Sequence, residues 1–257
     1  MPTGYTAPFT PRGLASLVAP PPWHYAGWLL NVELECDPAR AAGFVPREVG
    51  VATGRGAVHF ADWQATTDGS ELLDPILSQY RETIVLVEVT RPDGTAANFC
   101  PLIYVDQDIS MVSGLLQGWP KKVGSTWLTR SLPLDHPAAA PLRAGTRLGA
   151  SLTVKDRRLI DAQLVLTGKA AAPIGFAARP TWGTVGWPDL TSPGSPPALR
   201  YLKPVVSSRV GGEWHDATGE LVFHETPREE LADLGLRRVV RASAGWLGIT
   251  ITGAVAG

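Results

Sequence analysis

The stretch GWLLNVELEC, residues 27–36, alternates apolar and polar side chains along its length. Its apolar side chains share one face of an extended chain: Trp28, Leu30, Val32, Leu34 and Cys36. Asn31, Glu33 and Glu35 fall on the other face. A period of two is typical of a strand with one buried face. A strand of this kind must pair with others to cover that face, so we expect a sheet-based core.

Further strands are predicted over 57–66, 82–90, 96–105 and 236–253, and RPDG at 91–94 is a turn signal between two of them. The segment LGASLTVKDRRLIDAQLVLTG, residues 148–168, predicts a hairpin with a charged tip at DRR. Most of these strands follow one another through short connections. The pattern therefore predicts a mainly antiparallel β fold.

Three short helices are expected beside the strands. Asp37 and Pro38 are typical of an N-cap and a first helical residue, and Gly43 with Pro46 would end that helix. The segment ISMVSGLLQ, residues 109–117, has helical spacing and stops at Gly118. The segment TPREELADLG, residues 226–235, carries the pattern of a capping box and a terminal glycine, and predicts a third helix.

The chain has 257 residues, of which 44% are hydrophobic, enough to bury a full core. We expect a single domain over 1–257. Residues 1–22 are rich in Pro, Gly and Ala and predict an extended N-terminal arm. Residues 171–198 are rich in Pro and Gly and predict a long loop, which in a compact domain is more often functional or an assembly arm than random coil.

Composition argues against several partners. Charged residues are 18% of the chain and the formal net charge is −1, so there is no basic field for nucleic acid and no polybasic segment for a membrane surface. No signal peptide or long apolar stretch is recognisable. We therefore expect a soluble cytoplasmic protein.

The sequence predicts neither a metal site nor an organic cofactor. The five histidines lack the HxH or HxxxH spacing of metal ligands, and Cys36 and Cys100 are far apart and lack CxxC spacing. No GxSxG nucleophile elbow occurs, and Gly54-Arg55-Gly56 is too short for a phosphate-binding loop. Both cysteines are expected in the core.

The segment LLQGWPKKV, residues 115–123, places two lysines side by side after a Trp-Pro step and among apolar residues. Like charge and apolar surroundings both disfavour an ammonium group, so they favour the free amine, which attacks carbonyls. Successive side chains of an extended segment point to opposite faces, so only one of the two lysines is expected to point inward. The alternative interpretation of this segment is that both lysines lie on the surface and are solvated.

Gly118-Trp119-Pro120-Lys121-Lys122 resembles the active-site segment of the acetoacetate decarboxylases, enzymes that use an activated lysine. The resemblance extends along most of the chain. PPWHYAGWLLNVELECD and AVHFADW are similar to two strands of that family, and Tyr80-x-Glu82 has a similar spacing before the lysines. A pattern of W, G, L and F from Trp214 to Leu234 also recurs.

This resemblance implies a barrel-type sheet, a homo-oligomeric assembly and specific catalytic roles. Lys121 would form an imine with the substrate, and Lys122 would be its structural or electrostatic neighbour. Glu82 would position the substrate or relay protons.

The chain also departs from the decarboxylase pattern. Gly27 stands at or beside the place of an active-site arginine, and Ala61 and Leu115 stand where the decarboxylases carry carboxylates. Gln117, four residues before Lys121, is instead similar to the aldolase-dehydratases of the same superfamily. Those enzymes join pyruvate to an aldehyde and then eliminate water.

We therefore expect a lyase, active in secondary metabolism, that acts on a small 2-oxo or 3-oxo acid and, in the aldol reaction, on an aldehyde. Gln117 and Tyr80 could hydrogen-bond the aldol hydroxyl, and Trp28, Trp63 and Trp119 are candidate walls for the aldehyde. Three alternatives stay open: decarboxylation of a 3-oxo acid, a cyclase or dehydratase that forms no imine, and a non-enzymatic binder of small molecules.

Overall fold

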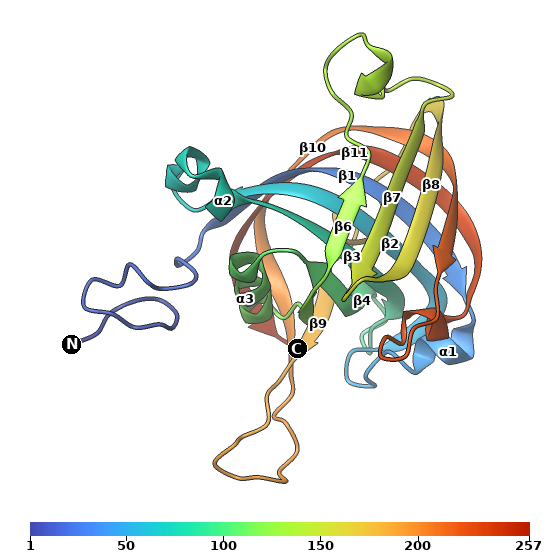
Figure 1. Ribbon diagram of the computed structural model, residues 1–257. Helices are drawn as coiled ribbons and strands as arrows, with labels where there is room; N and C mark the ends of the chain where they lie inside the picture. Colours follow the sequence, from blue (N-terminus) through green and yellow to red (C-terminus); the bar gives the residue numbers. More distant parts are fainter.

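One sheet of eleven strands dominates the computed structural model, which describes residues 1–257 (Figure 1). The strands are β1 (Trp23–Cys36), β2 (Val51–Thr66), β3 (Gln79–Thr90), β4 (Ala96–Val105), β5 (Lys121–Val123), β6 (Ser125–Leu128), β7 (Arg147–Val154), β8 (Arg157–Ala170), β9 (Thr181–Val185), β10 (Arg200–Phe223) and β11 (Leu236–Ala256). The α-helices are α1 (Pro38–Ala42), α2 (Pro75–Ser78) and α3 (Asp108–Gln117). No helix is long and apolar enough to span a bilayer.

The sheet closes on itself because β10 and β11 are long enough to pair with several neighbours. The strand order is β11-β1-β2-β3-β4-β9-β10-β8-β7-β6, and β10 also pairs with β11, which completes a ring. All pairings are antiparallel except β4 with β5 and β4 with β9. The predicted class, mainly antiparallel β with short helices in a barrel-type sheet, is confirmed.

Alternation along the strands separates two buried clusters on opposite faces of the sheet. The larger core holds 26 buried residues and includes the face of β1 predicted from the sequence, namely Trp28, Leu30, Val32, Leu34 and Cys36. The smaller core holds 15 buried residues and includes Leu29 of β1 and Trp63 of β2. Side chains next to each other on one strand therefore enter different cores. Cys36 and Cys100 are free and buried, as predicted.

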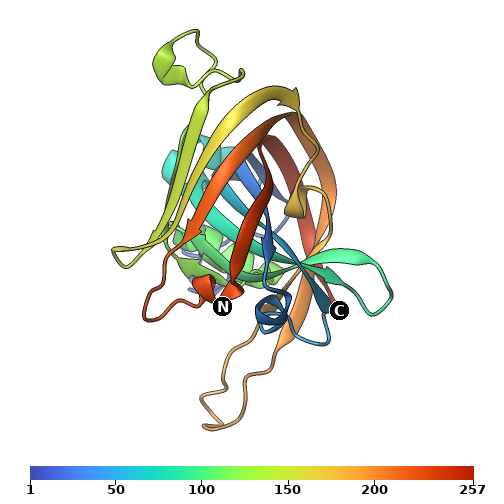
Figure 2. The ribbon, with the colours of Figure 1, turned by 90° about the vertical axis from the view of Figure 1, so that its right-hand side faces the viewer.

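The strands β7 and β8 contribute buried side chains to the larger core, and Leu128 of β6 packs against it. Figure 2 shows these three strands along one side of the barrel. The hairpin predicted over 148–168 is present as β7 and β8. The N-terminal arm extends away from the barrel in Figure 1, and the loop between β9 and β10 projects from one end of it.

Two local predictions need correction. The predicted helix over 226–235 is wrong: a 3₁₀ turn covers only Leu231–Leu234, and Gly235 ends it in the left-handed conformation. The capping box does not form because the Glu229 carboxylate instead accepts from Lys122 and Tyr104.

The predicted loop over 171–198 also contains ordered structure, namely a 3₁₀ turn at Gly175–Ala177 and the strand β9. Strand β10 was not predicted, since one proline and three glycines interrupt its alternation.

Candidate active site

The position of Lys121 follows from the end of helix α3. Gly118 has φ +99°, a left-handed conformation that glycine adopts without strain, and it ends the helix. The chain then turns into β5, which pairs in parallel with β4 so that Lys121 lies beside Ile103. Because Ile103 belongs to the smaller core, Lys121 also points into that core.

The Lys121 ammonium is buried and paired. Its Nζ lies 2.8 Å from Glu82 Oε2 and donates to Ser110 Oγ at 2.9 Å. The side chains of Lys121 and Glu82 are each 6% exposed. The ring of Tyr80 has its centroid 5.4 Å from Nζ. A buried ion pair of this kind costs desolvation, which is more often tolerated at functional sites than in purely structural cores.

The other carboxylate oxygen of Glu82, Oε1, accepts a hydrogen bond from the indole Nε1 of Trp63 at 2.8 Å. Trp63 fits there because its direct partner across β1 is Gly27. A Cβ at Gly27 would lie 2.4 Å from Trp63 Cε3. Trp63 therefore occupies the space of any side chain at position 27, where the sequence resemblance had placed an arginine.

The place of a second carboxylate in the decarboxylase pattern is Ala61, which carries no charge. Ala61 lies directly opposite Glu82 on the neighbouring strand. A carboxylate at position 61 would therefore stand beside that of Glu82, where like charges destabilise one another. Glu82 is the one acidic residue that lines the cavity around Lys121.

The face of α3 that covers Lys121 is small and polar. Ser110, Ser113, Gly114 and Gln117 are buried, at the i, i+3, i+4 and i+7 spacing of one helical face. A Cβ at Gly114 would lie 2.4 Å from Lys121 Cδ and Cε. The absence of a side chain at Gly114 thus makes room for the lysine stem beneath the helix.

Three further polar side chains line the cavity around Lys121. Gln117 Nε2 donates to the Tyr25 hydroxyl at 3.1 Å. Burial raises the pKa of Tyr25 to about 12 and that of Tyr80 well above its ordinary value. Both phenols are therefore neutral near pH 7 and can donate hydrogen bonds to a substrate oxygen.

Lys122 points to the opposite face of β5. Its Nζ lies 2.6 Å from Glu229 Oε1, and its side chain is 45% exposed. Glu229 also accepts from the Tyr104 hydroxyl at 2.8 Å. The expectation that only one lysine points inward is thus met by Lys121. The ammonium of Lys122 is turned away from that of Lys121 and neutralised by its own partner.

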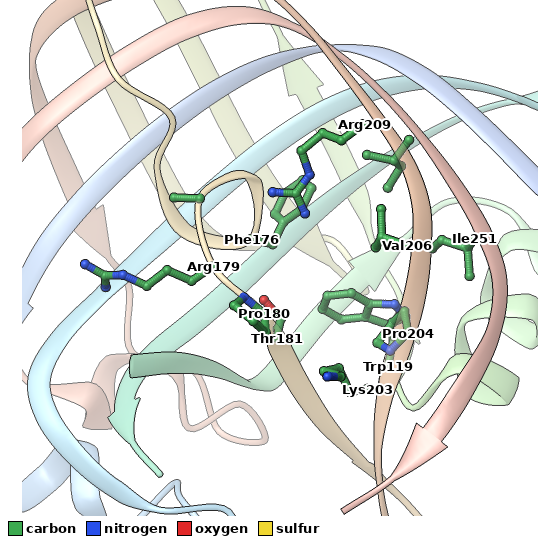
Figure 3. A pocket seen from close by; sticks show the side chains of 12 residues that line it. Trp119, Phe176, Arg179, Pro180, Thr181, Lys203, Pro204, Val206, Arg209 and Ile251 are labelled. Carbon is green, nitrogen blue, oxygen red and sulfur yellow. The ribbon is translucent and has the colours of Figure 1, made fainter. Parts of the chain in front are cut away.

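Two neighbouring cavities lie at this end of the barrel. The inner cavity has a volume of about 40 Å³ and is lined by Lys121, Glu82, Tyr25, Tyr80, Trp63 and Gln117, with apolar neighbours. The outer cavity has a volume of about 320 Å³ (Figure 3). Four residues line both cavities and form the boundary between them: Trp119, Phe176, Ile249 and Ile251.

The structure brings together Lys121, Glu82, Gln117, Tyr80, Trp119 and Trp63, six of the eight residues predicted for the site. Lys122 and Trp28 lie elsewhere. Trp28 belongs to the larger core, where its Nε1 donates to Thr129 O at 2.9 Å. It was misplaced because its neighbours Gly27 and Leu29 lie on the strand face toward Lys121, and adjacent residues of a strand cannot share a face.

Sequence reasoning missed Tyr25, Ser110, Gly114 and Phe176. Tyr25 could have been found from its parity with Gly27 on β1. The small polar face of α3 is visible in the sequence as Ser110, Ser113, Gly114 and Gln117 at helical spacing. Phe176 comes from the loop predicted over 171–198, and no sequence signal points to it. No group of three or more metal-ligating side chains is close enough together to hold a metal ion.

A closed sheet with a buried lysine-carboxylate pair at the end of a cavity defines a class of proteins suited to carbonyl chemistry. The family model for acetoacetate decarboxylase matches residues 6–256. The chain therefore belongs to the acetoacetate decarboxylase family, and it is an enzyme of that family.

Several solved structures are similar to this chain over nearly its whole length. The enduracididine biosynthesis enzyme MppR, complexed with the condensation product of pyruvate and imidazole 4-carboxaldehyde, is 28% identical with a TM-score of 0.91, covering 100% of this chain and 97% of that one. MppR complexed with pyruvate is 27% identical, with a TM-score of 0.91, and the alignment covers 100% of this chain and 98% of that one.

An acetoacetate decarboxylase-like enzyme from Sphingomonas wittichii RW1 is 27% identical with a TM-score of 0.88, covering 99% of this chain and 100% of that one. An acetoacetate decarboxylase at 16% identity and a TM-score of 0.79 shares the fold, over 99% of this chain and 95% of that one. A search of curated proteins gave no match.

Proposed function

We propose that this enzyme is a lyase that binds a small oxo acid as an imine on Lys121, and that its reaction is the aldol condensation of pyruvate with an aldehyde followed by loss of water. The observation that carries this proposal is the buried contact of 2.8 Å between Lys121 Nζ and Glu82 Oε2 at the end of a cavity. The MppR complexes with pyruvate and with a condensation product support the choice of substrate.

Glu82 has the position needed to start the reaction. Its carboxylate can accept a proton from the Lys121 ammonium, which leaves a free amine. The amine nitrogen attacks the ketone carbon to give a carbinolamine, and the proton held by Glu82 passes to its hydroxyl, which leaves as water and gives a protonated imine. Neutral Tyr25 and Tyr80 can donate to the oxygen that leaves as water.

The protonated imine withdraws electrons from the adjacent carbon. Loss of a proton from that carbon gives an enamine, which attacks the aldehyde carbon and forms a carbon–carbon bond. A proton and the aldol hydroxyl then leave as water, and hydrolysis of the imine releases the unsaturated oxo acid and restores the amine of Lys121. Gln117 is placed to hydrogen-bond the aldol hydroxyl, with Glu82 as the group that moves protons.

This proposal is tested by trapping. The protein is incubated with pyruvate and borohydride, and the peptide that contains Lys121 is examined by mass spectrometry. We expect a reduced pyruvate adduct on Lys121 in the wild-type protein and none on any lysine in Lys121→Met. The matched control is Lys122→Met, which removes the neighbouring ammonium but leaves the buried pair, and it should keep the adduct.

The same protein can be tested for two alternative reactions. A 3-oxo acid decarboxylase would release carbon dioxide from acetoacetate. Gly27 and Ala61 stand where the resemblance places an arginine and a carboxylate of the decarboxylases, so the site lacks those charged groups, and the MppR complexes favour the aldol reaction instead. A cyclase or dehydratase without an imine is favoured by the Lys121–Glu82 ion pair itself, in which the ammonium could act as a proton donor. Turnover that depends on Lys121 without any trapped adduct would support that alternative.

We further propose that copies of the chain associate, with the loop between β9 and β10 as an assembly arm. Trp187, Leu190 and Leu199 of this loop are exposed, which is costly for apolar side chains in water. Shortening the loop to a tight turn should lower the mass measured by light scattering. An unchanged mass would exclude this role for the loop.

A further inference from the structure

The inner cavity is too small to hold a whole oxo acid. Its volume of about 40 Å³ corresponds to roughly three water-sized positions. A 2-oxo acid has more non-hydrogen atoms than that. A substrate whose carbonyl reaches Lys121 therefore extends into a neighbouring cavity. The outer cavity adjoins the inner one at Trp119 and Phe176, and a third cavity, which shares Tyr25 and Tyr80 with the inner one, is lined by Glu71 and by no Lys or Arg.

The outer cavity has cationic side chains and no acidic ones. Its lining includes Arg179, Lys203 and Arg209, and no Asp or Glu (Figure 3). The charge of Arg179 is balanced, since its guanidinium pairs with Glu88. Lys203 and Arg209 form no ion pair with any carboxylate of the chain, whose pairs involve other residues.

Arg209 is directed into this cavity by the register of the sheet. On β11 its direct partner is Ile249, which lines both cavities. Directly opposed residues of an antiparallel pair share a face, so the side chain of Arg209 lies on the same face of the sheet as that of Ile249. The guanidinium donates to the carbonyl oxygen of Ala177 next to Phe176, which fixes it at the mouth (Figure 3). A guanidinium has five N–H groups, so others remain for a ligand.

Lys203 stands farther along the same strand. Its Nζ lies 5.5 Å from the centroid of the Trp182 ring. The floor between the two cations is apolar, made by Val206 and Ile251 among others. An apolar floor flanked by unpaired cations is complementary to a short carbon chain that carries an anionic group.

We infer that the outer cavity is an anion subsite, in which Arg209 and Lys203 bind a carboxylate of a substrate whose carbonyl condenses with Lys121. This inference rests on the imine step of the proposed function, and it adds to pyruvate a second substrate class, oxo compounds with an anionic group separated from the reacting carbonyl by a carbon chain. The inner cavity offers no cation except Lys121 itself, so the outer cavity is where such a group is neutralised.

The test is borohydride trapping with a series of methyl ketones. The anionic probes are 4-oxopentanoate, 5-oxohexanoate and 6-oxoheptanoate, and the neutral probes are pentan-2-one, hexan-2-one and heptan-2-one. We expect wild-type protein to trap at least one anionic probe faster than its neutral counterpart. In Arg209→Gln the ratio of anionic to neutral trapping should fall about fivefold, as expected for loss of a partly exposed charged hydrogen bond. The matched control is Arg200→Gln, which removes an exposed arginine of the same strand outside the cavity.

The outcomes separate this inference from the proposed function. Equal trapping of anionic and neutral probes, unaffected by Arg209→Gln, would overturn the anion subsite and leave the imine chemistry standing. Trapping of pyruvate but of no ketone would also overturn the subsite. If neither pyruvate nor any ketone is trapped, the imine proposal fails, and calorimetric binding of hexanoate then decides the subsite. Binding that weakens about fivefold in Arg209→Gln and not in Arg200→Gln supports it, and binding that is absent or equal in both variants overturns it.

Discussion

The larger and smaller cores lie on opposite faces of the same strands, yet they bury different kinds of side chain. The larger core contains 26 residues and no charged side chain, and its polar groups include the hydroxyl of Tyr104, which reaches Glu229, and the indole N–H of Trp28, which donates to Thr129 O. The smaller core is built around an ion pair, two neutral phenols and a cavity. One core gains stability from burial, while the other tolerates desolvated charge in order to keep a reactive amine. The comparison indicates that the sheet is stabilised from one face and carries chemistry on the other.

The largest expected effect comes from breaking the ion pair of the smaller core. Lys121→Met leaves the Glu82 carboxylate buried with only the Trp63 indole as its partner, so we expect a loss of about 3–5 kcal/mol in the free energy of unfolding. Denaturant titration measures this loss. In Lys121→Met/Glu82→Gln, which removes the charge and keeps an oxygen for Trp63, most of the loss should be recovered while no adduct forms. A double variant as unstable as the single one would contradict the charge argument.

The larger core should respond through stability alone. Leu159 is fully buried there, and Leu159→Ala should lower the free energy of unfolding by about 3 kcal/mol through lost burial and a new cavity. Adduct formation with pyruvate, measured below the unfolding transition, should keep its wild-type rate. A slowed rate in this variant would show that the two faces of the sheet are coupled.

A buried histidine beside the smaller core predicts the dependence of stability on pH. His59 Nδ1 lies 2.7 Å from Asn31 Oδ1, and burial lowers the pKa of His59 from 6.5 to about 3. The unfolded chain therefore binds more protons than the folded one between these pH values, so stability falls as the pH falls through 6.5.

Between pH 7 and pH 5 the contribution of His59 is a loss of about 2 kcal/mol. Wild-type protein should lose that much more stability over this range than His59→Gln, which cannot gain the proton. Parallel pH profiles for the two proteins would show that His59 is not kept neutral by the fold.

The smallest effect is expected at Lys122, the twin of Lys121 on the outer face of β5. Its pair with Glu229 is partly exposed, so Lys122→Met should change the free energy of unfolding by less than about 1 kcal/mol. The contrast with Lys121→Met isolates burial as the variable, because the two lysines share their residue type and their segment. A loss comparable to that of Lys121→Met would contradict the assignment of the two faces.

Local patterns determined much of this fold. The alternation in β1 identified the five residues that enter the larger core, and Gly118 identified the end of α3 and hence the place of the lysines. Both depend on interactions between residues close in sequence. The alternation also implied that Trp28 and the residues beside it face opposite ways, which the placement of Trp28 in the site overlooked.

Other features depended on contacts between distant segments. Glu229 was available for a capping box by sequence, but Lys122 and Tyr104, more than a hundred residues earlier, bind its carboxylate instead. Strand β10 carries a proline and three glycines that weaken a strand pattern, and its length is specified by pairing with β8, β9 and β11.

The sequence by itself determined the family, the strand faces and the segment that carries the reactive lysine, because short-range patterns and motif spacing encode them. Only the tertiary structure decided which lysine is buried against Glu82, that Trp63 fills the space beside Gly27, and that Arg209 stands at the mouth of the cavity. Those outcomes depend on strand register and ring closure, which join residues far apart in the chain.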